Sequence, residues 1–398
     1  MGLLLSIVIP THNRAKYAIY AIKSILKIES NDIELVVTDT STNDLLQEML
    51  KKDALLEDKR LKYIRPVDKL DMTGNHNAAV SHATGEYLCL IGDDDTITEE
   101  LIDVAKWALE NNIEIIAPNI VANYAWPDFK SITFGNKHAS RLYIPRKVKG
   151  ISYHDSVSAY RGALKNAAQG TDNMPKIYHG LVRHSVLEKL KQVSGNYFWG
   201  SSPDVSGAVG LALCSTQFVV IDYPLTIPGA SGGSNTGRSA LKQHTGKLSS
   251  EDQTKTFVEK GWSVGVPKFF SVETVWAHAA IETIQRINPA TVSDFNFAKL
   301  LAVCKVLHPE YLKEIVTAEQ EVILAYQLMP SQFHAAIKKG IWHYRIKRLF
   351  YIIRRALRPT ASGGRLFIPN LQTVEETPPA LENYLKSKTW EVKDFLKS

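Results

Sequence analysis

The stretch Tyr87-Leu-Cys-Leu-Ile-Gly-Asp-Asp-Asp95 joins five apolar residues to three consecutive carboxylates. We interpret it as a buried strand that ends in a loop, because a short apolar run bounded by glycine is typical of strands in a sheet core. Asp93 and Asp95 can face one hard cation, and Mg²⁺ or Mn²⁺ commonly binds one or two carboxylates plus substrate phosphates. The stretch therefore indicates a metal and diphosphate site. The alternative is a helix start, with Asp94 or Asp95 as the cap of a helix that begins near Thr98.

Strand and helix patterns alternate on both sides of this stretch. Residues 3–10 form an apolar run, residues 17–28 have apolar positions at helical spacing, and residues 33–38 have the pattern of a second strand. This alternation predicts an α/β fold with a mostly parallel sheet, helices on both faces, and ligands beyond the carboxyl ends of the strands. Further predicted elements are strands at 62–64 and 87–91 and helices at 74–83 and 99–111.

Four motifs, in this order and spacing, resemble those of family 2 glycosyltransferases. The resemblance covers about residues 3–115 well and is patchy to about residue 235. It implies the GT-A fold, which is a Rossmann-like nucleotide-diphospho-sugar transferase fold, and inverting transfer of a sugar from a nucleotide donor. The motifs are Ser6-Ile-Val-Ile-Pro-Thr-His-Asn-Arg14, Val36-Val-Thr-Asp39, Asn75-His-Asn-Ala-Ala79 followed by Ala83-Thr-Gly-Glu-Tyr87, and Gly92-Asp-Asp-Asp95.

The first motifs imply a nucleotide pocket. By the resemblance, Pro10, Thr11 and Arg14 line this pocket, and Asp39 accepts a hydrogen bond from the base. A simple turn role is the alternative for Asp39, since Asp is common where a strand ends. His76 is also expected in the donor site, although the family commonly has Arg at that position, which leaves the contacts of that Arg open.

The acidic motif implies the metal site of the family. Asp95 is the expected metal ligand, together with Asp93, while Asp93 or Asp94 contacts the ribose or the sugar. The expected cofactor is Mg²⁺ or Mn²⁺, because a divalent cation stabilises the charge that grows on the departing diphosphate. A UDP-sugar is the expected donor, and a glycan or lipid-linked molecule is the expected acceptor.

Asp204 is the candidate general base. It follows the Gly/Ser/Pro-rich turn at residues 199–203 and precedes an apolar, helix-like run at 205–213. Inverting transfer needs a base on the face of the sugar opposite the leaving group. In the family, this role belongs to an acid in a Glu-Asp or similar acidic pair at about this distance after the metal motif, whereas here the pair is Pro-Asp. A helix cap or a first-turn acid is the alternative.

Residues 227–238, Ile-Pro-Gly-Ala-Ser-Gly-Gly-Ser-Asn-Thr-Gly-Arg, have the composition of a mobile lid over a diphosphate, with Arg238 adding positive charge. The stretch lacks the spacing of a P-loop, and a plain flexible loop is the alternative. His244 is a further candidate metal ligand. His179 and Arg183 are candidates for contact with a phosphate or the acceptor, or for structural hydrogen bonds.

The chain divides by pattern and charge. We predict a catalytic domain at 1–240, with a nucleotide half at 1–115 and an acceptor half at 116–240, then a helical extension at 241–332 with helices at 272–287 and 297–307. Residues 333–398 carry 13 Lys/Arg and 5 Asp/Glu, a net charge of +8, whereas the rest of the chain has a net charge of −2. This tail needs its own explanation.

Residues 337–358 combine an apolar helical face with many basic side chains. The pattern is typical of an interfacial helix on an anionic membrane surface, where each basic residue contributes about 1 kcal/mol. The alternative is a packing helix with a solvated basic face. No apolar run approaches the ~20 residues that span a bilayer, so attachment would be peripheral. Three widely separated cysteines fit reduced thiols, and we expect a cytoplasmic protein on the inner membrane face.

The sequence thus predicts a metal-dependent glycosyltransferase. The resemblance to the family implies a role in bacterial surface polysaccharide or glycolipid synthesis. A sugar nucleotidylyltransferase is one alternative, although Pro-Thr-His-Asn-Arg stands where those enzymes have a Gly-rich loop. A non-catalytic protein that binds membrane or nucleic acid is another. The basic residues share their segment with an apolar face rather than forming a groove, so we expect no nucleic-acid partner.

Overall fold

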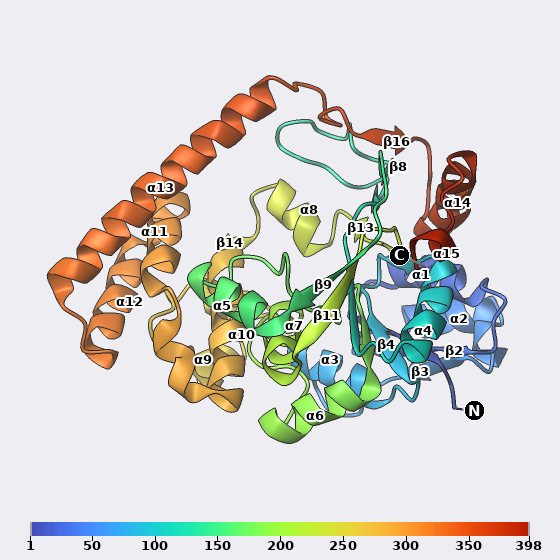
Figure 1. Ribbon diagram of the computed structural model, residues 1–398, viewed down its shortest axis with the longest axis horizontal. Coiled ribbons are helices and arrows are strands. Elements are labelled where there is room, and N and C mark those ends of the chain that lie inside the picture. Colours follow the sequence, from blue (N-terminus) through green and yellow to red (C-terminus); the bar gives the residue numbers. More distant parts are fainter. Residues whose placement is uncertain (1, 397–398) are drawn as a thin grey trace.

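A computed structural model describes residues 2–396. Its centre is an eight-stranded sheet with the strand order β3-β2-β1-β4-β10-β6-β11-β9 (Figure 1). Neighbours β3, β2, β1 and β4 run parallel, β10 is antiparallel to both of its neighbours, and β9 is antiparallel to β11. The predicted α/β class is confirmed. The strands are β1 Leu5–Thr11, β2 Ile33–Asp39, β3 Leu61–Ile64, β4 Tyr87–Leu90, β6 Ile115–Pro118, β9 Ile151–Asp155, β10 Leu181–Arg183 and β11 Gln217–Ile221.

Helices cover the two faces of the sheet (Figure 1). Every residue of β1 and β2 is buried, because both faces of these central strands are covered. The predicted elements of the first 115 residues are present, each with its ends shifted by a few residues at most. The helices are α1 Ala15–Leu26, α2 Leu45–Lys52, α3 Met72–Ser81, α4 Glu100–Glu110, α5 Ser156–Lys165, α6 His184–Ser194 and α7 Pro203–Cys214.

Short strands beside the sheet organise the segment whose composition predicts a mobile lid. Residues 226–230 form two short strands, one antiparallel to β5 and one parallel to β7, and a short helix follows. The segment is therefore tied into the fold by backbone hydrogen bonds that no local pattern announces. These elements are β5 Thr96–Ile97, β7 Asn123–Ala125, β8 Arg141–Ile144, β12 Thr226–Ile227, β13 Gly229–Ala230 and α8 Asn235–Ala240.

The helical extension shares its core with the acceptor half. Buried residues of α5 and α7 belong to the same apolar cluster as those of α10 and α11, so tight packing crosses the predicted boundary at residue 240. The helices predicted at 272–287 and 297–307 are α10 and α11. The extension consists of β14 Thr245–Gly246, α9 Phe257–Lys260, β15 Phe270–Ser271, α10 Val272–Ile287, α11 Phe297–Leu307 and α12 Leu312–Ala325.

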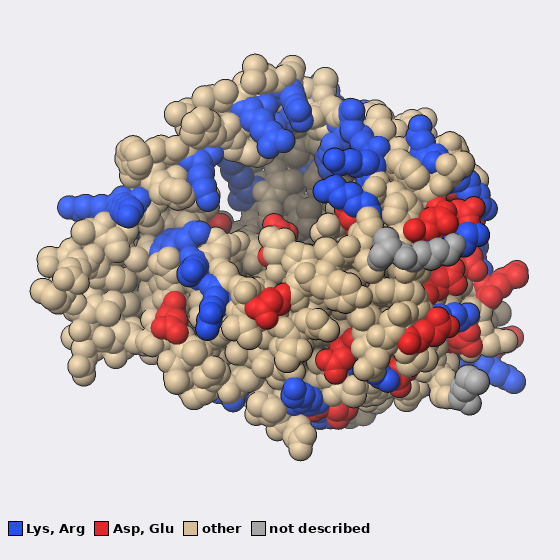
Figure 2. Space-filling view, viewed as in Figure 1, with Lys and Arg blue, Asp and Glu red and all other residues tan. Residues whose placement is uncertain are grey.

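The tail at 333–398 lies in two places. Helix α13, Pro330–Ala356, begins against α11 and extends away from the body, whereas the residues after it return to the N-terminal half (Figure 1). Strand β16, Leu366–Ile368, pairs with β8, and α14, Thr377–Ser387, and α15, Val392–Phe395, add apolar side chains to the core around β1 and α1. Figure 2 shows a hollow between α13 and α8, with Lys and Arg side chains around its rim. Within residues 2–396, no helix is long and apolar enough to cross a membrane.

Candidate functional site

The carboxyl ends of three parallel strands meet at one edge of the sheet. Thr11 ends β1 and lies in register with Asp39, the last residue of β2. The Thr11 hydroxyl also donates a hydrogen bond of 2.6 Å to Asp93, which follows β4 on the other side of β1. One threonine thus separates the aspartate expected to contact the base from the acidic motif. The structure brings these predicted residues together.

Arg14 is the counter-charge of the acidic motif. Its guanidinium lies 2.6 Å from Asp93 and 2.9 Å from Asp94, and the Arg14 side chain is 19% exposed. Ser231 also donates a 2.6 Å hydrogen bond to Asp94 and accepts one of 2.9 Å from Arg14. Arg14 therefore joins the end of β1, the acidic motif and the Gly-rich segment in one polar network.

Asp95 has a different set of partners. One of its oxygens accepts a backbone hydrogen bond from Gly229, and the other accepts from Gly92, each at 2.6 Å. The Tyr178 hydroxyl donates to that second oxygen at 3.0 Å, and His179 Nε2 lies 3.2 Å from it. These contacts make Asp95 an anchor that fixes the loop.

Neighbouring carboxylates in the motif have opposite pKa shifts. Burial raises the pKa of Asp94 to about 7, and Arg14 opposes part of this rise. Burial also acts to raise the pKa of Asp95, but His179 and the amides of Gly229 and Gly92 outweigh it and hold that pKa below its ordinary value. Burial thus dominates at Asp94, whereas hydrogen bonds and the neighbouring imidazole dominate at Asp95.

The Gly-rich segment lies directly on the acidic motif. A Cβ atom on Gly229 would stand 1.8 Å from the Asp94 carbonyl oxygen, so only glycine permits this approach. The indole of Trp126 donates to the same carbonyl at 3.0 Å. The Gly232 amide donates to Asp128 at 2.9 Å. Close backbone packing holds the segment over the carboxylates, so any opening toward a ligand must break these contacts.

Strain and unpaired polar atoms mark the same region. His179 has a left-handed backbone with φ of 61°, which is uncommon for a residue other than glycine, and its Nδ1 is buried without a hydrogen-bond partner among residues 2–396. Asn75, near the start of α3, donates to the carbonyl oxygen of Thr11 at 3.0 Å, but its own side-chain oxygen has no partner in the described part of the chain. Such features cluster at functional sites, where an incoming ligand satisfies the unpaired group.

Asp39 is held in place on both sides. Its carboxylate accepts hydrogen bonds from the Ser41 amide at 2.8 Å and the Tyr63 hydroxyl at 2.7 Å. The loop after β1 is tied to the loop after β2, since the Asn13 amide donates to the Ser41 hydroxyl at 2.7 Å. Pro10 is buried in β1. The expected nucleotide pocket is therefore built on a rigid strand edge.

Asp204 lies in the first turn of α7, after Pro203, and accepts a short hydrogen bond from Ser202. Its charge acts on two residues of the site. It contributes to the raised pKa of Tyr178, which burial raises most, and it opposes the fall that burial causes in the pKa of His76. His76 Nδ1 lies 2.7 Å from the carbonyl oxygen of Met72. Asp204 thus lies close enough to Tyr178 and His76 for its charge to act on the pKa of both.

Three other predicted contacts point elsewhere. Arg238 pairs with Glu251 at 2.8 Å, so Arg14 is the arginine that meets the acidic motif. Arg183 pairs with Glu86 at 2.6 Å. His244 packs on an aromatic ring, and burial together with Arg238 lowers its pKa to about 4. Of the two residues considered for a phosphate contact, only His179 reaches the acidic motif.

The acidic motif fits a divalent cation in the kind of its donor atoms. Carboxylate oxygens are the ligands that Mg²⁺ and Mn²⁺ take. Among residues 2–396, however, no three or more His, Cys, Asp or Glu side chains are grouped so that they could hold a metal ion. Hydrogen bonds from Thr11, Arg14 and Ser231 occupy oxygens of Asp93 and Asp94. In this arrangement the Arg14 guanidinium, rather than a metal ion, supplies positive charge to Asp93 and Asp94.

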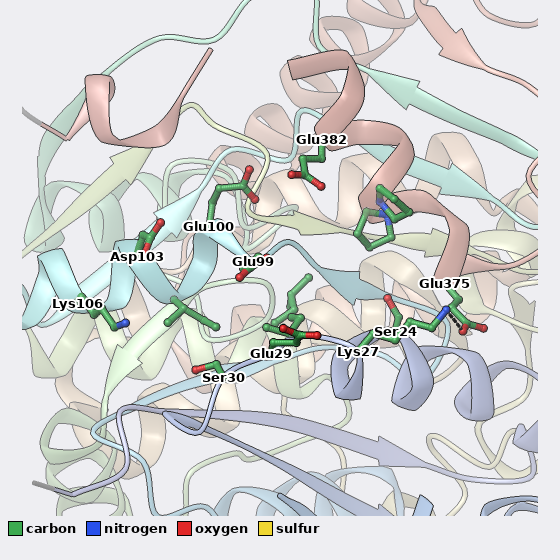
Figure 3. Close-up of a pocket in the computed structure, with 15 residues that line it drawn as sticks. Ser24, Lys27, Glu29, Ser30, Glu99, Glu100, Asp103, Lys106, Glu375 and Glu382 are labelled. Atoms are coloured by element: carbon green, nitrogen blue, oxygen red, sulfur yellow. Dashed lines mark ion pairs between the residues drawn. The ribbon is translucent and has the colours of Figure 1, made fainter. Parts of the chain in front are cut away.

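One cavity lies away from this edge. It has a volume of about 520 Å³, is lined by parts of α1, α4 and α14, and contains none of the predicted site residues. Figure 3 shows carboxylates from these helices and the residues next to them around it, with Lys27 paired to Glu375. Its acidic lining does not suit an anionic diphosphate. Its carboxylates are Glu29, Glu99, Glu100, Asp103, Glu375 and Glu382.

Sequence reasoning missed Ser231, Tyr178 and Trp126. Ser231 belongs to the segment that is singled out for its glycines, but no pattern assigns a partner to its hydroxyl. Tyr178 stands next to the candidate His179, and its burial among carboxylates leaves no local signal. Trp126 is a single aromatic in an irregular stretch.

Part of this chain matches a known family. Residues 6–167 match the model of Glycosyl transferase family 2. The stretch includes Arg14, Asp39 and all of the acidic motif. It ends before Asp204.

Individual relatives match over similar stretches. Glycosyltransferase GlyG of Streptococcus pneumoniae is 28% identical over 125 residues, which is 31% of this chain and 40% of that protein. Putative colanic acid biosynthesis glycosyl transferase WcaA of Escherichia coli is 28% identical over 153 residues, which is 37% and 54% of the two chains. GalNAc(5)-diNAcBac-PP-undecaprenol beta-1,3-glucosyltransferase of Campylobacter jejuni is 32% identical over 94 residues, 23% and 30% of the two chains. The matches span less than two thirds of these relatives.

Solved structures resemble this one at low sequence identity. Residues 1–349 of S. aureus TarS, in complex with UDP-GlcNAc, are 13% identical, with 85% of this chain and 89% of that chain covered and a TM-score of 0.45. The mannosyltransferase PcManGT of Pyrobaculum calidifontis, in complex with GDP-Man and Mn²⁺, is 14% identical, with 86% and 88% covered and a TM-score of 0.39.

Proposed function

We propose that this chain, whose residues 6–167 match the model of Glycosyl transferase family 2, moves a sugar from a nucleotide-sugar donor to an acceptor hydroxyl with inversion. The observation that carries the proposal is the shared edge of Asp39, Thr11 and Asp93, where the register and a 2.6 Å hydrogen bond join the expected base contact to the acidic motif. Ligands bind beyond the carboxyl ends of parallel strands, and this is such an edge.

Arg14 and Ser231 are the proposed diphosphate contacts. Both place hydrogen-bond donors at Asp94, Arg14 from the end of β1 and Ser231 from the Gly-rich segment. A guanidinium binds phosphate oxygens in a bidentate manner, and a hydroxyl adds a neutral donor. Donor binding would exchange the carboxylate partners of these groups for phosphate oxygens.

A divalent cation is the proposed cofactor, Mg²⁺ or Mn²⁺. We propose Asp93 and Asp94 as its ligands, because their partners Arg14 and Ser231 would move to the diphosphate, whereas Asp95 stays held by two backbone amides. The cation would supply positive charge to the departing diphosphate. Asp94 must be ionised to bind it, and burial holds the pKa of Asp94 at about 7, so we expect cation binding to strengthen as the pH rises through neutrality.

Asp204 is the proposed general base. The charge of Asp204 contributes to the raised pKa of Tyr178, whose hydroxyl donates to Asp95. This supports a position of Asp204 beside the acidic motif. A carboxylate there can take the proton of an acceptor hydroxyl as it attacks the sugar. The neighbouring Ser202 holds one oxygen of Asp204 and leaves the carboxylate oriented.

The names of two relatives support an acceptor class. We propose a glycan or lipid-linked acceptor and a UDP-sugar donor, in bacterial surface polysaccharide or glycolipid synthesis. The name of the Campylobacter jejuni relative includes PP-undecaprenol, and that of the Escherichia coli relative includes colanic acid biosynthesis. Those names describe the relatives, so the donor and the acceptor of this chain require direct measurement.

Helix α13 supports a peripheral position on a cytoplasmic membrane face. Its start is packed on the body through the buried Ile337, whereas Phe350 and Leu357 near its end are 67% and 79% exposed. At 3.6 residues per turn, Ile353 lies roughly 160° around the helix from Ile337. The apolar stripe thus faces away from the body, where an anionic bilayer could cover it. Basic residues beside the stripe include Lys347, Arg354 and Arg358.

A nucleotide screen tests the proposed function. We expect UDP to raise the thermal midpoint more than GDP, CMP or dTDP, and Mn²⁺ to increase that shift. Asp93→Asn should weaken the effect of Mn²⁺, whereas Glu382→Gln in the acidic cavity should not change it. A chain that no nucleotide stabilises, with or without Mn²⁺, would contradict the proposed donor site.

A further inference from the structure

Three arginines from separate segments gather at the far end of α13. Arg355 lies in the last turn of α13, Arg141 begins β8, and Arg365 directly precedes β16. Burial and then these three charges lower the pKa of His138, with which they share one small region. We name Arg141, Arg355 and Arg365 the arginine cluster.

Each guanidinium of the cluster rests on an aromatic ring. The distance from the guanidinium carbon to the ring centroid is 4.6 Å for Arg355 over Phe134, 3.8 Å for Arg365 over Tyr143, and 4.2 Å for Arg141 over Phe367. Cation–π stacking fixes the plane of a guanidinium and leaves its edge N–H groups available. The rings also contact one another through His138, which is 5.7 Å from Phe134 and 5.9 Å from Tyr143. The cluster is therefore one assembled unit.

No carboxylate neutralises this unit. Throughout residues 2–396, none of the three cluster arginines forms an ion pair with Asp or Glu. Within the same range the Arg141 guanidinium has its ring contact and no hydrogen bond. Arg355 donates to the carbonyl oxygens of Arg358, Thr360 and Ala361, and Arg365 donates to the Ser362 carbonyl oxygen and to the Asn123 side chain. The arginines that do have a carboxylate partner are Arg14, Arg60, Arg65, Arg183, Arg238 and Arg286.

We propose that the arginine cluster is a binding site for a phosphate group, with Arg141 and Arg365 as its main ligands. Guanidinium groups on aromatic rings match the planar, bidentate recognition of phosphate oxygens. An anion at this position would relieve the mutual repulsion of the three cations. The site is separate from the acidic motif, and it does not depend on the proposed sugar transfer.

Two features connect the site with the rest of the molecule. The loop that carries Phe134 and His138 also carries Asp128, which accepts from Gly232 of the segment over the acidic motif. Figure 2 shows basic side chains around the hollow between α13 and α8. A bound phosphate group would therefore lie beside the loop that also contacts this segment. The group could belong to a phospholipid or to a soluble phosphorylated molecule.

Chemical protection tests this proposal residue by residue. Phenylglyoxal modifies accessible guanidinium groups, and peptide mass spectrometry gives the rate at each arginine of the full chain. The probes are inorganic pyrophosphate, phosphatidylglycerol vesicles and phosphatidylcholine vesicles. Arg161, exposed on α5 and without an ion pair among residues 2–396, is the internal control in every sample.

We expect pyrophosphate to slow modification of Arg141 and Arg365 at least fivefold, with less than a twofold effect on Arg161. Protection by phosphatidylglycerol but not by phosphatidylcholine would identify a membrane headgroup as a source, whereas protection by pyrophosphate alone would indicate a soluble one. Either result supports the site. The site would be overturned if none of the three probes slowed modification of Arg141 and Arg365, or if Arg161 were protected to the same extent. The readout requires no sugar donor, so it is independent of the proposed transferase activity.

Binding by variants gives a second measurement. Arg141→Gln and Arg365→Gln keep polar side chains but remove charge, and Arg161→Gln removes the same charge elsewhere. We expect either cluster variant to lose at least tenfold of the affinity for the probe that protects the site, while Arg161→Gln stays within twofold. Unchanged affinity in both cluster variants would also overturn the proposal.

Discussion

Replacement of Arg14 by methionine gives a direct test of the buried charge network. Met keeps much of the volume of the side chain but removes the cation that lies 2.6 Å from Asp93 and 2.9 Å from Asp94. The two carboxylate side chains are only 7% and 8% exposed, so water cannot replace the lost partner well. Removal of one member of a buried ion pair typically costs about 3–5 kcal/mol. We expect Arg14→Met to lose a similar amount of its free energy of unfolding.

The loss should depend on pH in a defined direction. Burial holds the folded-state pKa of Asp94 at about 7, above its ordinary value of 3.8, and Arg14 opposes this rise. Without Arg14 that pKa rises further, so the folded variant keeps a proton that the unfolded chain has released. A raised carboxyl pKa makes stability fall as pH increases, by about 1.4 kcal/mol per pH unit for one proton. The gap between wild type and Arg14→Met should therefore widen from pH 6 to pH 8.

Urea unfolding, followed by circular dichroism at several pH values, measures this gap. Lys16→Met is the matched control, because the Lys16 ion pair with Asp128 is exposed, at 68% and 41% of the two side chains, and should contribute about 0–1 kcal/mol. Adding Asp94→Asn to Arg14→Met should recover part of the loss. A loss below about 1 kcal/mol at every pH, the same as in Lys16→Met, would refute the reasoning.

Three further outcomes follow from the structure. Gly229→Ala should lower the free energy of unfolding in urea by about 1–3 kcal/mol, because its Cβ would stand 1.8 Å from the Asp94 carbonyl oxygen. Gly162→Ala, which has open space in α5, should be neutral or stabilising by up to about 1 kcal/mol. Equal effects of the two substitutions would contradict this view. Asp204→Asn should keep donor affinity within twofold in calorimetry while donor turnover falls about 10²- to 10⁴-fold, and near-normal turnover would reject the base. Burial lowers the pKa of His278 to about 3, so the unfolded chain binds its proton first and stability falls as pH drops below about 6.5. His278→Gln should show a shallower fall between pH 6.5 and 4.5 in urea unfolding, by up to about 1.4 kcal/mol per pH unit, and identical slopes would be inconsistent with the neutral buried imidazole.

The parallel sheet and its edge could be predicted from local patterns. Apolar runs and helical spacing are local, and the rule that parallel strands end together places Asp39 near Asp93 without any contact information. Thr11 lies in register with Asp39 and donates a hydrogen bond to Asp93, as this rule leads one to expect. Helices α10 and α11 are likewise defined by their own periodicity.

The partners of the carboxylates could not be predicted in this way. Asp95 accepts from Gly229, which is 134 residues away, and Asp94 accepts from Ser231, which is 137 residues away. Such contacts depend on strands that pair across the fold, such as β12 with β5, and composition alone suggests only a loose lid. The predicted metal role of Asp95 rests on its place in the motif, whereas its contact with Gly229 depends on the fold.

The end of the chain shows the same limit. Net charge and helical spacing indicate one basic tail, but the later residues contain buried apolar side chains that add to the N-terminal core, such as Leu381 and Val392. Their apolar content is modest, and only the return of β16 to β8 makes their burial possible. The pattern therefore predicts helix α13 but not the docking of the residues that follow it.

Calorimetric titration of UDP into three forms of the chain, the wild type and two variants, tests the central claim most directly. Asp39→Asn changes the strand edge, and Glu382→Gln changes the acidic cavity of about 520 Å³ between α1, α4 and α14. A hydrogen bond to a charged group contributes about 1.5–3 kcal/mol, so Asp39→Asn should weaken UDP at least tenfold, while Glu382→Gln should bind like the wild type. Unchanged binding in Asp39→Asn, or a selective loss in Glu382→Gln, would contradict a nucleotide site at the edge formed by β1, β2 and β4.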